Sequence, residues 1–322
     1  MPIGIEHIEY YLPELSISSK ELSNRFNFDL EFVEKKIGTH QIFISKHDEF
    51  TSDLAVAASQ KIFSKRPDLK EKIDVIVLCT QTPDFQLPHT SALVQKKMGL
   101  KKDIACFDIG LGCSGFVYGL SIISSFMESN GFNYGLLITA ETYSKIICDT
   151  DRNTKPIFSD GAAATLMSRE PMYIPMKFSF GTNGYKYDSL IYSSKVNNSG
   201  IHGDSALYMD GRGIFELVAT EVPKDIEKCL QINGLKFDDL DVFVFHQASK
   251  YMLETLTKIL NIDDPRKVVK CTERFGNTVS SSIPMALTII GINESQKNRN
   301  ILISGFGVGL SWATTILNEK GK

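Results

Sequence analysis

Short apolar runs that end in polar turns recur along the chain. Residues 73–82 read IDVIVLCTQT, and residues 240–249 read LDVFVFHQAS. Continuous runs of this length, rich in Val, Ile and Phe, are typical of strands that are buried on both faces of a sheet. The two runs begin 167 positions apart and predict equivalent buried strands.

A second pair of apolar runs has almost the same separation. Residues 135–140 (GLLITA) and 300–305 (NILISG) begin 165 positions apart. Two nearly equal offsets indicate an internal duplication. We therefore predict two halves, residues 1–170 and 171–322, each with its own set of strands.

Helical patterns separate the strands within each half. Residues 52–66 predict one helix, and residues 212–234 predict its counterpart, with Pro223 marking a kink or a helix start. Strands that alternate with helices are typical of an α/β fold with a mostly parallel sheet. Residues 181–210, rich in Gly, Asn, Ser and Tyr, predict a long connection that forms a pocket wall.

Composition excludes several classes of protein. The 322 residues are 43% hydrophobic and carry a formal net charge of -3, which argues against a dedicated nucleic-acid binder. No run approaches the roughly 18 apolar residues of a membrane span, and the N-terminal residues lack a signal-peptide pattern, so we expect a cytoplasmic protein without membrane contact. The six cysteines include no CxxC pair, which predicts reduced thiols and no metal site.

One cysteine lies in a distinct setting. The segment 108–116, DIGLGCSGF, follows the apolar run 104–107 and precedes apolar residues at helical spacing. This places Cys113 at a strand-to-helix turn, where backbone N–H groups and the helix dipole favour a thiolate. We interpret Cys113 as a nucleophile and the other cysteines as small core residues.

The second half supplies two candidate partners for Cys113. His246 ends the predicted strand at 240–245, where strand carboxyl ends open onto the crevice of an α/β sheet. Asn277 lies in a Gly-Asn turn that leads into a Ser-rich helix start. Taken singly, each fits a structural role. Together, the two side chains are suited to hold a thioester oxygen on which negative charge develops.

A glycine-rich loop follows the last predicted strand. Residues 305–312, GFGVGLSW, lack the Lys and Ser/Thr of a phosphate-binding P-loop. The glycines indicate a backbone that approaches another group closely. We predict that the N–H groups of Gly307 and Cys113 form an oxyanion hole for acyl transfer.

These segments, in this order and over essentially the whole chain, resemble the beta-ketoacyl-acyl carrier protein synthase III family. The segments 150–154 (TDRNT) and 157–163 (IFSDGAA) resemble the same family. The resemblance implies a thiolase-like five-layer α-β-α-β-α fold built from two duplicated halves, and a homodimer.

The resemblance also implies a reaction and its substrates. An acyl group from acyl-CoA is transferred to Cys113, malonyl-acyl carrier protein then loses carbon dioxide, and its carbanion attacks the acyl-cysteine to give a 3-oxoacyl product. His246 and Asn277 stabilise the enolate oxygen. No metal or bound cofactor is implied, because both substrates arrive on pantetheine arms.

Several implied substrate contacts differ from the family pattern. Phe32 and Arg152 match the residues that enclose the CoA adenine, with phenylalanine in place of tryptophan. Leu87 matches a position that reaches across the dimer into the partner's acyl pocket, where leucine leaves more room than phenylalanine. Tyr143 and Phe158 match the pocket wall, and Tyr143 reduces that room.

The carrier-protein contact also departs from the family. Ser249 replaces the usual asparagine after His-Gln-Ala, and Tyr251 replaces an arginine. Lys250 and Lys258 are candidates to substitute for that cation. The resemblance leaves open the type of primer, the pathway, and whether the extender is bound to carrier protein or to CoA.

Several related enzyme classes fit the same motifs less well. A degradative thiolase needs a second cysteine in the glycine loop, and hydroxymethylglutaryl-CoA synthase needs a glutamate where this chain has Gln81. Plant-type polyketide synthases are usually longer. The remaining alternatives are an acyltransferase that passes the acyl group to an alcohol or amine, and a dimeric binding subunit without catalysis; the presence of Cys113, His246 and Asn277 argues against the latter.

Overall fold

The computed structural model describes residues 2–193, 206–294 and 298–319. Its largest sheet contains ten strands. In spatial order they are β12 (Val242–Phe245), β13 (Asn300–Gly307), β14 (Ser311–Glu319), β8 (Tyr173–Pro175), β1 (Gly4–Tyr11), β7 (Gly161–Ser168), β6 (Tyr134–Glu141), β4 (Val75–Cys79) and β5 (Ala105–Ile109), with β9 (Ser179–Thr182) also on β14.

The predicted duplication is visible in the strand pairing. In the first half β4 runs parallel to β6, and β6 then pairs antiparallel with β7. In the second half β12 runs parallel to β13, and β13 pairs antiparallel with β14. The two halves join where β1 and β8 pair at Ile5 and Tyr173. The boundary between residues 170 and 171 stays a prediction.

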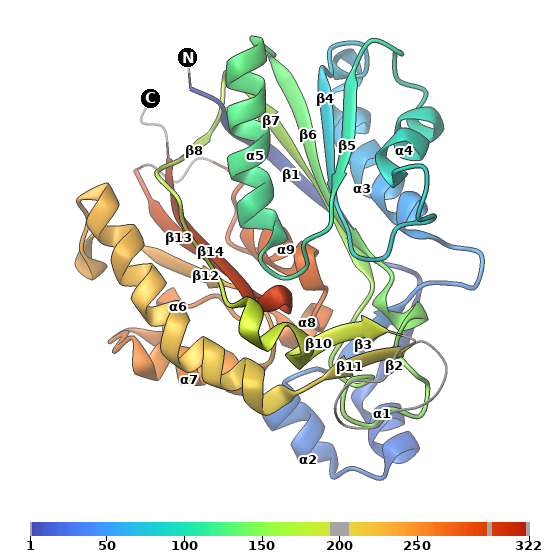
Figure 1. Ribbon diagram of the computed structural model, residues 1–322, viewed down its shortest axis with the longest axis vertical. Coiled ribbons are helices and arrows are strands. Elements are labelled where there is room, and N and C mark those ends of the chain that lie inside the picture. Colours follow the sequence, from blue (N-terminus) through green and yellow to red (C-terminus); the bar gives the residue numbers. More distant parts are fainter. Residues whose placement is uncertain (1, 194–205, 295–297, 320–322) are drawn as a thin grey trace.

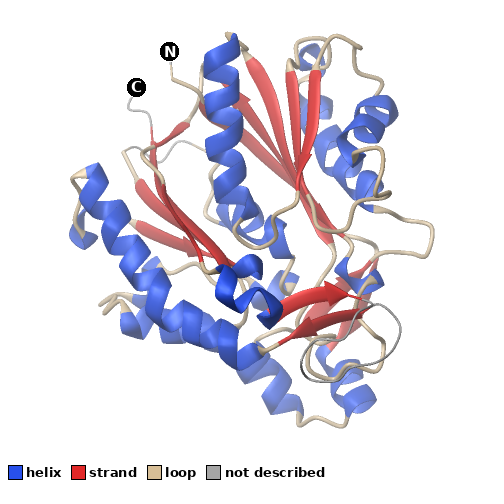
Figure 2. Ribbon diagram, in the orientation of Figure 1, coloured by secondary structure: helices blue, strands red, loops and turns tan. Residues whose placement is uncertain are grey.

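The helices form layers between and outside the two sheet regions (Figures 1 and 2). Between the two sheet regions lie α5 (Gly115–Asn130) and α9 (Ser282–Ile289), which share one core with the facing strands. Outside the first half, α3 (Thr51–Lys65) and α4 (Thr90–Met98) pack on the sheet. Outside the second half lie α6 and α7 (Lys250–Ile259).

This arrangement is the expected five-layer α-β-α-β-α fold. The outer helices α3 and α6 (Gly211–Asn233) begin within one residue of their predicted starts. Pro223 lies inside α6, which begins at Gly211, so it does not mark the helix start. β4 and β12 end at the polar turns that the sequence predicts, whereas β6 and β13 extend beyond their predicted apolar runs.

Smaller elements close the lower part of the molecule in Figure 1. Two hairpins pair β2 (Leu15–Ser18) with β3 (Gln41–Ile44), and β10 (Leu190–Ser193) with β11 (Ala206–Met209). Three short helices, α1 (Ser19–Phe26), α2 (Leu30–Phe32) and α8 (Thr272–Phe275), accompany them. The predicted pocket wall at 181–210 contains β10 and all of β11, while its residues 194–205 lie outside the described part of the chain.

The described residues contain neither a membrane-spanning helix nor a metal-binding cluster. None of their helices is long and apolar enough to cross a membrane. The same residues hold no group of three or more His, Cys, Asp or Glu side chains arranged to bind a metal ion.

Candidate active site

Cys113 lies in the turn between β5 and α5, as the sequence predicts, and only 4% of it is exposed. Glycines at the end of β13 let this strand approach Cys113. A Cβ added at Gly305 would come within 2.7 Å of the Cys113 carbonyl oxygen, and one at Gly307 within 2.9 Å of its sulfur. A side chain at either glycine would therefore displace the cysteine.

The environment of the sulfur differs from the expected thiolate site. Backbone N–H groups of Cys113 and Val308 act on the sulfur and lower its pKa, but burial outweighs them and raises the Cys113 pKa to about 12. The nearby Glu141 carboxylate raises the Cys113 pKa further. The thiol is therefore protonated at neutral pH before substrate arrives. The Val308 N–H is thus directed at the sulfur, while the oxyanion hole expected from the N–H groups of Gly307 and Cys113 stays a prediction.

His246 follows β12 directly and is almost fully buried. Its Nδ1 lies 2.7 Å from the Ser282 hydroxyl oxygen, and that oxygen also accepts the Gln247 N–H at 3.4 Å. We assign the Ser282 hydroxyl as the donor and Nδ1 as the acceptor of this hydrogen bond. The single ring proton of the neutral His246 then lies on Nε2. Burial lowers the His246 pKa to about 3, so the ring is neutral and its Nε2–H is a hydrogen-bond donor.

Asn277 is held at three points. Its N–H donates to the Ile157 carbonyl at 3.1 Å, and its carbonyl accepts the Ser159 N–H at 2.8 Å. Its side-chain Oδ1 accepts the Val279 N–H at 2.9 Å. The amide orientation is thereby fixed, with Nδ2 3.5 Å from the Ala248 carbonyl oxygen. Asn277 thus presents its amide donors on the side of His246.

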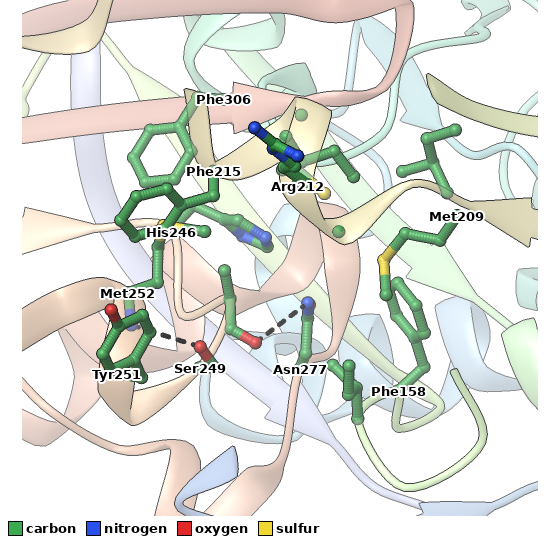
Figure 3. Close-up of a pocket in the computed structure, with 17 residues that line it drawn as sticks. Phe158, Met209, Arg212, Phe215, His246, Ser249, Tyr251, Met252, Asn277 and Phe306 are labelled. Carbon is green, nitrogen blue, oxygen red and sulfur yellow. Dashed lines mark hydrogen bonds between the residues drawn. The ribbon is translucent and has the colours of Figure 1, made fainter. Parts of the chain in front are cut away.

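The three side chains line one cavity of about 430 Å³ (Figure 3). Cys113 comes from the first half, and His246 and Asn277 come from the second. Most of the wall is apolar, and its described residues include Ile157, Phe158, Leu190, Met209, Ile214, Phe215, Met252 and Phe306. The Cys113 thiol and two neutral hydrogen-bond donors, His246 and Asn277, therefore face the same mainly apolar cavity.

Three other predicted residues lie in or next to this cavity. Phe158 and Ser249 line it. Ser249 also caps α7, because its hydroxyl accepts the Met252 N–H at 3.2 Å. Tyr143 is buried behind the wall, with its ring 5.1 Å from that of Phe158, in the same hydrophobic cluster as Cys113.

The remaining predicted contacts lie outside the cavity. Leu87 is 87% exposed. Phe32 and Arg152 each pack on Phe28 instead: the Phe28 ring lies 5.2 Å from the Phe32 ring, and the Arg152 guanidinium lies 4.7 Å from the Phe28 ring. Phe28 therefore contacts both residues that the sequence resemblance assigned to the CoA adenine.

Sequence reasoning missed the contribution of α6 and its approach. Met209, Arg212 and Phe215 line the cavity, and Tyr251 stacks on Phe215 with ring centroids 5.8 Å apart. The sequence indicates that a helix starts after the polar connection at 181–210. The spacing of its apolar residues does not show which face of α6 lies toward the cavity. Arg212 is the sole cation among the described lining residues.

Comparisons with known proteins agree with this geometry. Family models for 3-oxoacyl-[acyl-carrier-protein (ACP)] synthase III match residues 107–184, and those for its C-terminal part match residues 230–318. The beta-ketoacyl-[acyl-carrier-protein] synthase III of Streptococcus pneumoniae is 33% identical, over 97% of this chain and 98% of its own. The chain belongs to the 3-oxoacyl-[acyl-carrier-protein] synthase III family.

Solved structures of this family superpose over nearly the full chain. The synthase III of Thermus thermophilus is 29% identical with a TM-score of 0.90, covering 99% of this chain and 100% of its own. The synthase III from Pseudomonas aeruginosa PAO1 is 28% identical with a TM-score of 0.89, covering 100% and 99%. The protein is therefore a condensing enzyme of the thiolase fold and an acyltransferase.

Proposed function

We propose that the enzyme condenses an acyl group from acyl-CoA with malonyl-acyl carrier protein, with Cys113, His246 and Asn277 as its catalytic residues. The observation that carries this assignment is the single cavity lined by all three side chains. Relatives bearing the synthase III name support the substrate classes. The structure contributes the positions of the donors and of the thiol.

In the first half-reaction the Cys113 sulfur attacks the thioester carbon of acyl-CoA. The thiol proton is transferred to the departing CoA sulfur as the new carbon–sulfur bond forms and the old one breaks. The N–H groups of Cys113 and Gly307 are the proposed donors to the oxygen that becomes negative. Loading therefore depends on the first half and on the glycine loop.

In the second half-reaction the malonyl group loses carbon dioxide, and its electron pair passes into an enolate. The neutral His246 Nε2–H and the Asn277 amide bind the enolate oxygen. The carbanion carbon then attacks the acyl-cysteine carbonyl, and the Cys113 sulfur leaves and regains a proton. This step depends on the second half.

Arg212 and Lys36 are the cations proposed to meet the phosphate of the carrier's pantetheine arm. Arg212 lines the cavity, and the Lys36 ammonium lies 4.8 Å from the centre of the Tyr251 ring. Lys250, a sequence-based candidate for the same task, forms an ion pair with Glu273 at 3.1 Å. Arg152 and Phe32 remain proposed contacts of the CoA nucleotide.

We also propose a homodimer that forms along β5. This strand is the last in the sheet, and all five of its residues are partly exposed. Leu87 and Phe85 project nearby on the connection between β4 and α4, and both are among the most exposed apolar side chains described. An unprotected apolar edge of this kind is suited to pairing with a second copy.

Release of carbon dioxide from malonyl-acyl carrier protein tests the proposed reaction. The enzyme should release one carbon dioxide for each 3-oxoacyl product when acyl-CoA is present. Acyl loading with transfer to an added alcohol or amine, and no carbon dioxide, would favour the non-decarboxylating acyltransferase instead. Cys113→Ala is the control and should form no product.

A further inference from the structure

A carboxylate with no role in the proposed steps lies buried where the two halves meet. Glu141 is the last residue of β6, and none of its side chain is exposed. Such a group is retained only where donors compensate for its lost hydration. Four donors do so in part, three from the first half and one from the second, although burial still raises the Glu141 pKa to about 8.

The first-half donors come from the turn after β4. The Gln81 N–H donates to Glu141 Oε2 at 3.1 Å, the Thr82 hydroxyl at 3.0 Å and the Thr80 hydroxyl at 3.4 Å. The Thr82 hydroxyl oxygen also accepts the Thr142 N–H at 2.9 Å, so its own proton is directed to the carboxylate. The turn after β4 therefore holds one of the two carboxyl oxygens of Glu141, Oε2.

The second-half donor belongs to the segment that carries Asn277. The Ser280 hydroxyl donates to the other carboxylate oxygen, Oε1, at 2.9 Å. The preceding residue, Val279, has a φ of +53°, which a β-branched residue adopts only when its surroundings impose it. This turn gives Val279 the N–H position that holds the Asn277 side chain.

Neighbouring serines hold the same segment at other points. Ser281 donates to the Thr139 carbonyl at 3.0 Å, and Ser282 bonds to His246. The backbone of Asn277 is separately held by residues 157–159. The hydrogen bond from Ser280 to Glu141 thus holds the segment directly after the strained residue Val279.

We propose that Glu141 is a positioning residue for decarboxylative condensation, acting through Ser280 and Val279 on the amide of Asn277. The proposal rests on the proposed function, because only the second half-reaction uses that amide. Loading of Cys113 uses backbone N–H groups instead. Loss of the Glu141 anchor should therefore separate the two half-reactions, whereas a general loss of structure would impair both.

The test measures each half-reaction alone in Glu141→Gln and Ser280→Ala. Loading is followed as acyl mass gained at Cys113 after rapid quenching, and condensation as single-turnover discharge of preloaded acyl-enzyme by malonyl-acyl carrier protein. Loading should not fall below about a third of the rate of the unmodified enzyme, and in Glu141→Gln it should stay equal or rise, because the charge that raises the Cys113 pKa is removed. Condensation should fall roughly tenfold to a hundredfold, below the loss of about 10² to 10³ for a deleted oxyanion donor, because Asn277 itself remains.

A matched control and a double variant sharpen the result. Asp225 is another buried carboxylate, bonded to the Ser179 hydroxyl at 2.6 Å on the outer side of the second half, and Asp225→Asn should change neither half-reaction selectively. Because Glu141 and Ser280 act through one contact, the double variant should condense no more slowly than the slower single variant.

The proposal is overturned if both variants condense at the normal rate, or if loading and condensation fall in equal proportion. If Glu141→Gln does not fold, Ser280→Ala decides alone, by the same two rates. A failure of the proposed function is seen separately, because the unmodified enzyme would then release no carbon dioxide from malonyl-acyl carrier protein.

Discussion

Two opposing effects act on the sulfur of Cys113. The N–H groups at the start of α5 and in the glycine loop favour a thiolate, and burial in an apolar cluster favours the thiol. Burial prevails, which the sequence does not reveal, since it depends on Tyr143, Phe158 and Val279 from distant segments closing around the sulfur.

Alkylation of Cys113 should therefore keep accelerating with pH. With a Cys113 pKa of about 12, the thiolate fraction rises about tenfold for each pH unit from 6 to 9, without a plateau. Iodoacetamide labelling with peptide-resolved mass spectrometry measures this rate. The exposed Cys148, whose pKa is lowered by its hydrogen bond to Thr150, provides an internal comparison. A plateau for Cys113 below pH 8 would contradict this prediction.

His246 should show no titration across the working range of pH. Burial lowers its pKa to about 3, so the ring stays neutral between pH 5 and 8, with the proton on Nε2. Nitrogen-15 NMR of histidine-labelled enzyme measures both properties. Ser282→Ala removes the partner of Nδ1 and should shift the tautomer balance. An inflection near pH 6.5 for His246 would show that the ring is solvated rather than buried.

At the scale of elements, the sequence predicted the glycine loop after β13 and its close approach to Cys113. Its assignment of the oxyanion donors to Gly307 and Cys113 stays a prediction. The structure adds the Val308 N–H, which acts on the sulfur from an irregular turn in which Gly309 has a φ of +110°. A glycine-rich string shows that a backbone comes close, but not which of its N–H groups faces inward.

Gly307→Ala should abolish acyl loading. The added Cβ would lie 2.8 Å from the Cys113 Cβ and 2.9 Å from its sulfur, so the nucleophile must move away from its N–H donors. We expect a loss of about 10² or more in loading rate, comparable to removal of an oxyanion donor. Gly184→Ala is the matched control, because a Cβ there meets nothing within 4 Å. Equal loading by both variants would refute the close approach.

For the whole molecule, repeated strand patterns at offsets of 167 and 165 residues predicted two halves, and the paired strands β4–β6 and β12–β13 show them. Cys113, His246 and Asn277 were predicted to meet because each follows a strand or turn at the edge where the halves face each other. The Phe28 contact between Phe32 and Arg152 was not predictable, since it depends on how α1 and α2 fold over the loop at Arg152.

Like charges beside the exposed β5 edge should convert the proposed dimer to monomers. Leu87→Asp combined with Phe85→Asp places like charges at an exposed surface that we expect to become buried between copies. Light scattering after size-exclusion chromatography measures the mass in solution. Tyr185→Asp, at a residue 99% exposed, is the control and should leave the mass unchanged. An unmodified enzyme that is monomeric would contradict the dimer outright.

The account as a whole depends on an acyl group that is carried by Cys113 and removed by a decarboxylated malonyl unit. The most direct measurement is the intact mass of the enzyme, first with acyl-CoA and then after addition of malonyl-acyl carrier protein. We predict a mass gain of one acyl group at Cys113, and its complete loss on the second addition, with 3-oxoacyl product formed. An acyl group on another residue, or one that malonyl-acyl carrier protein leaves in place, would contradict the account.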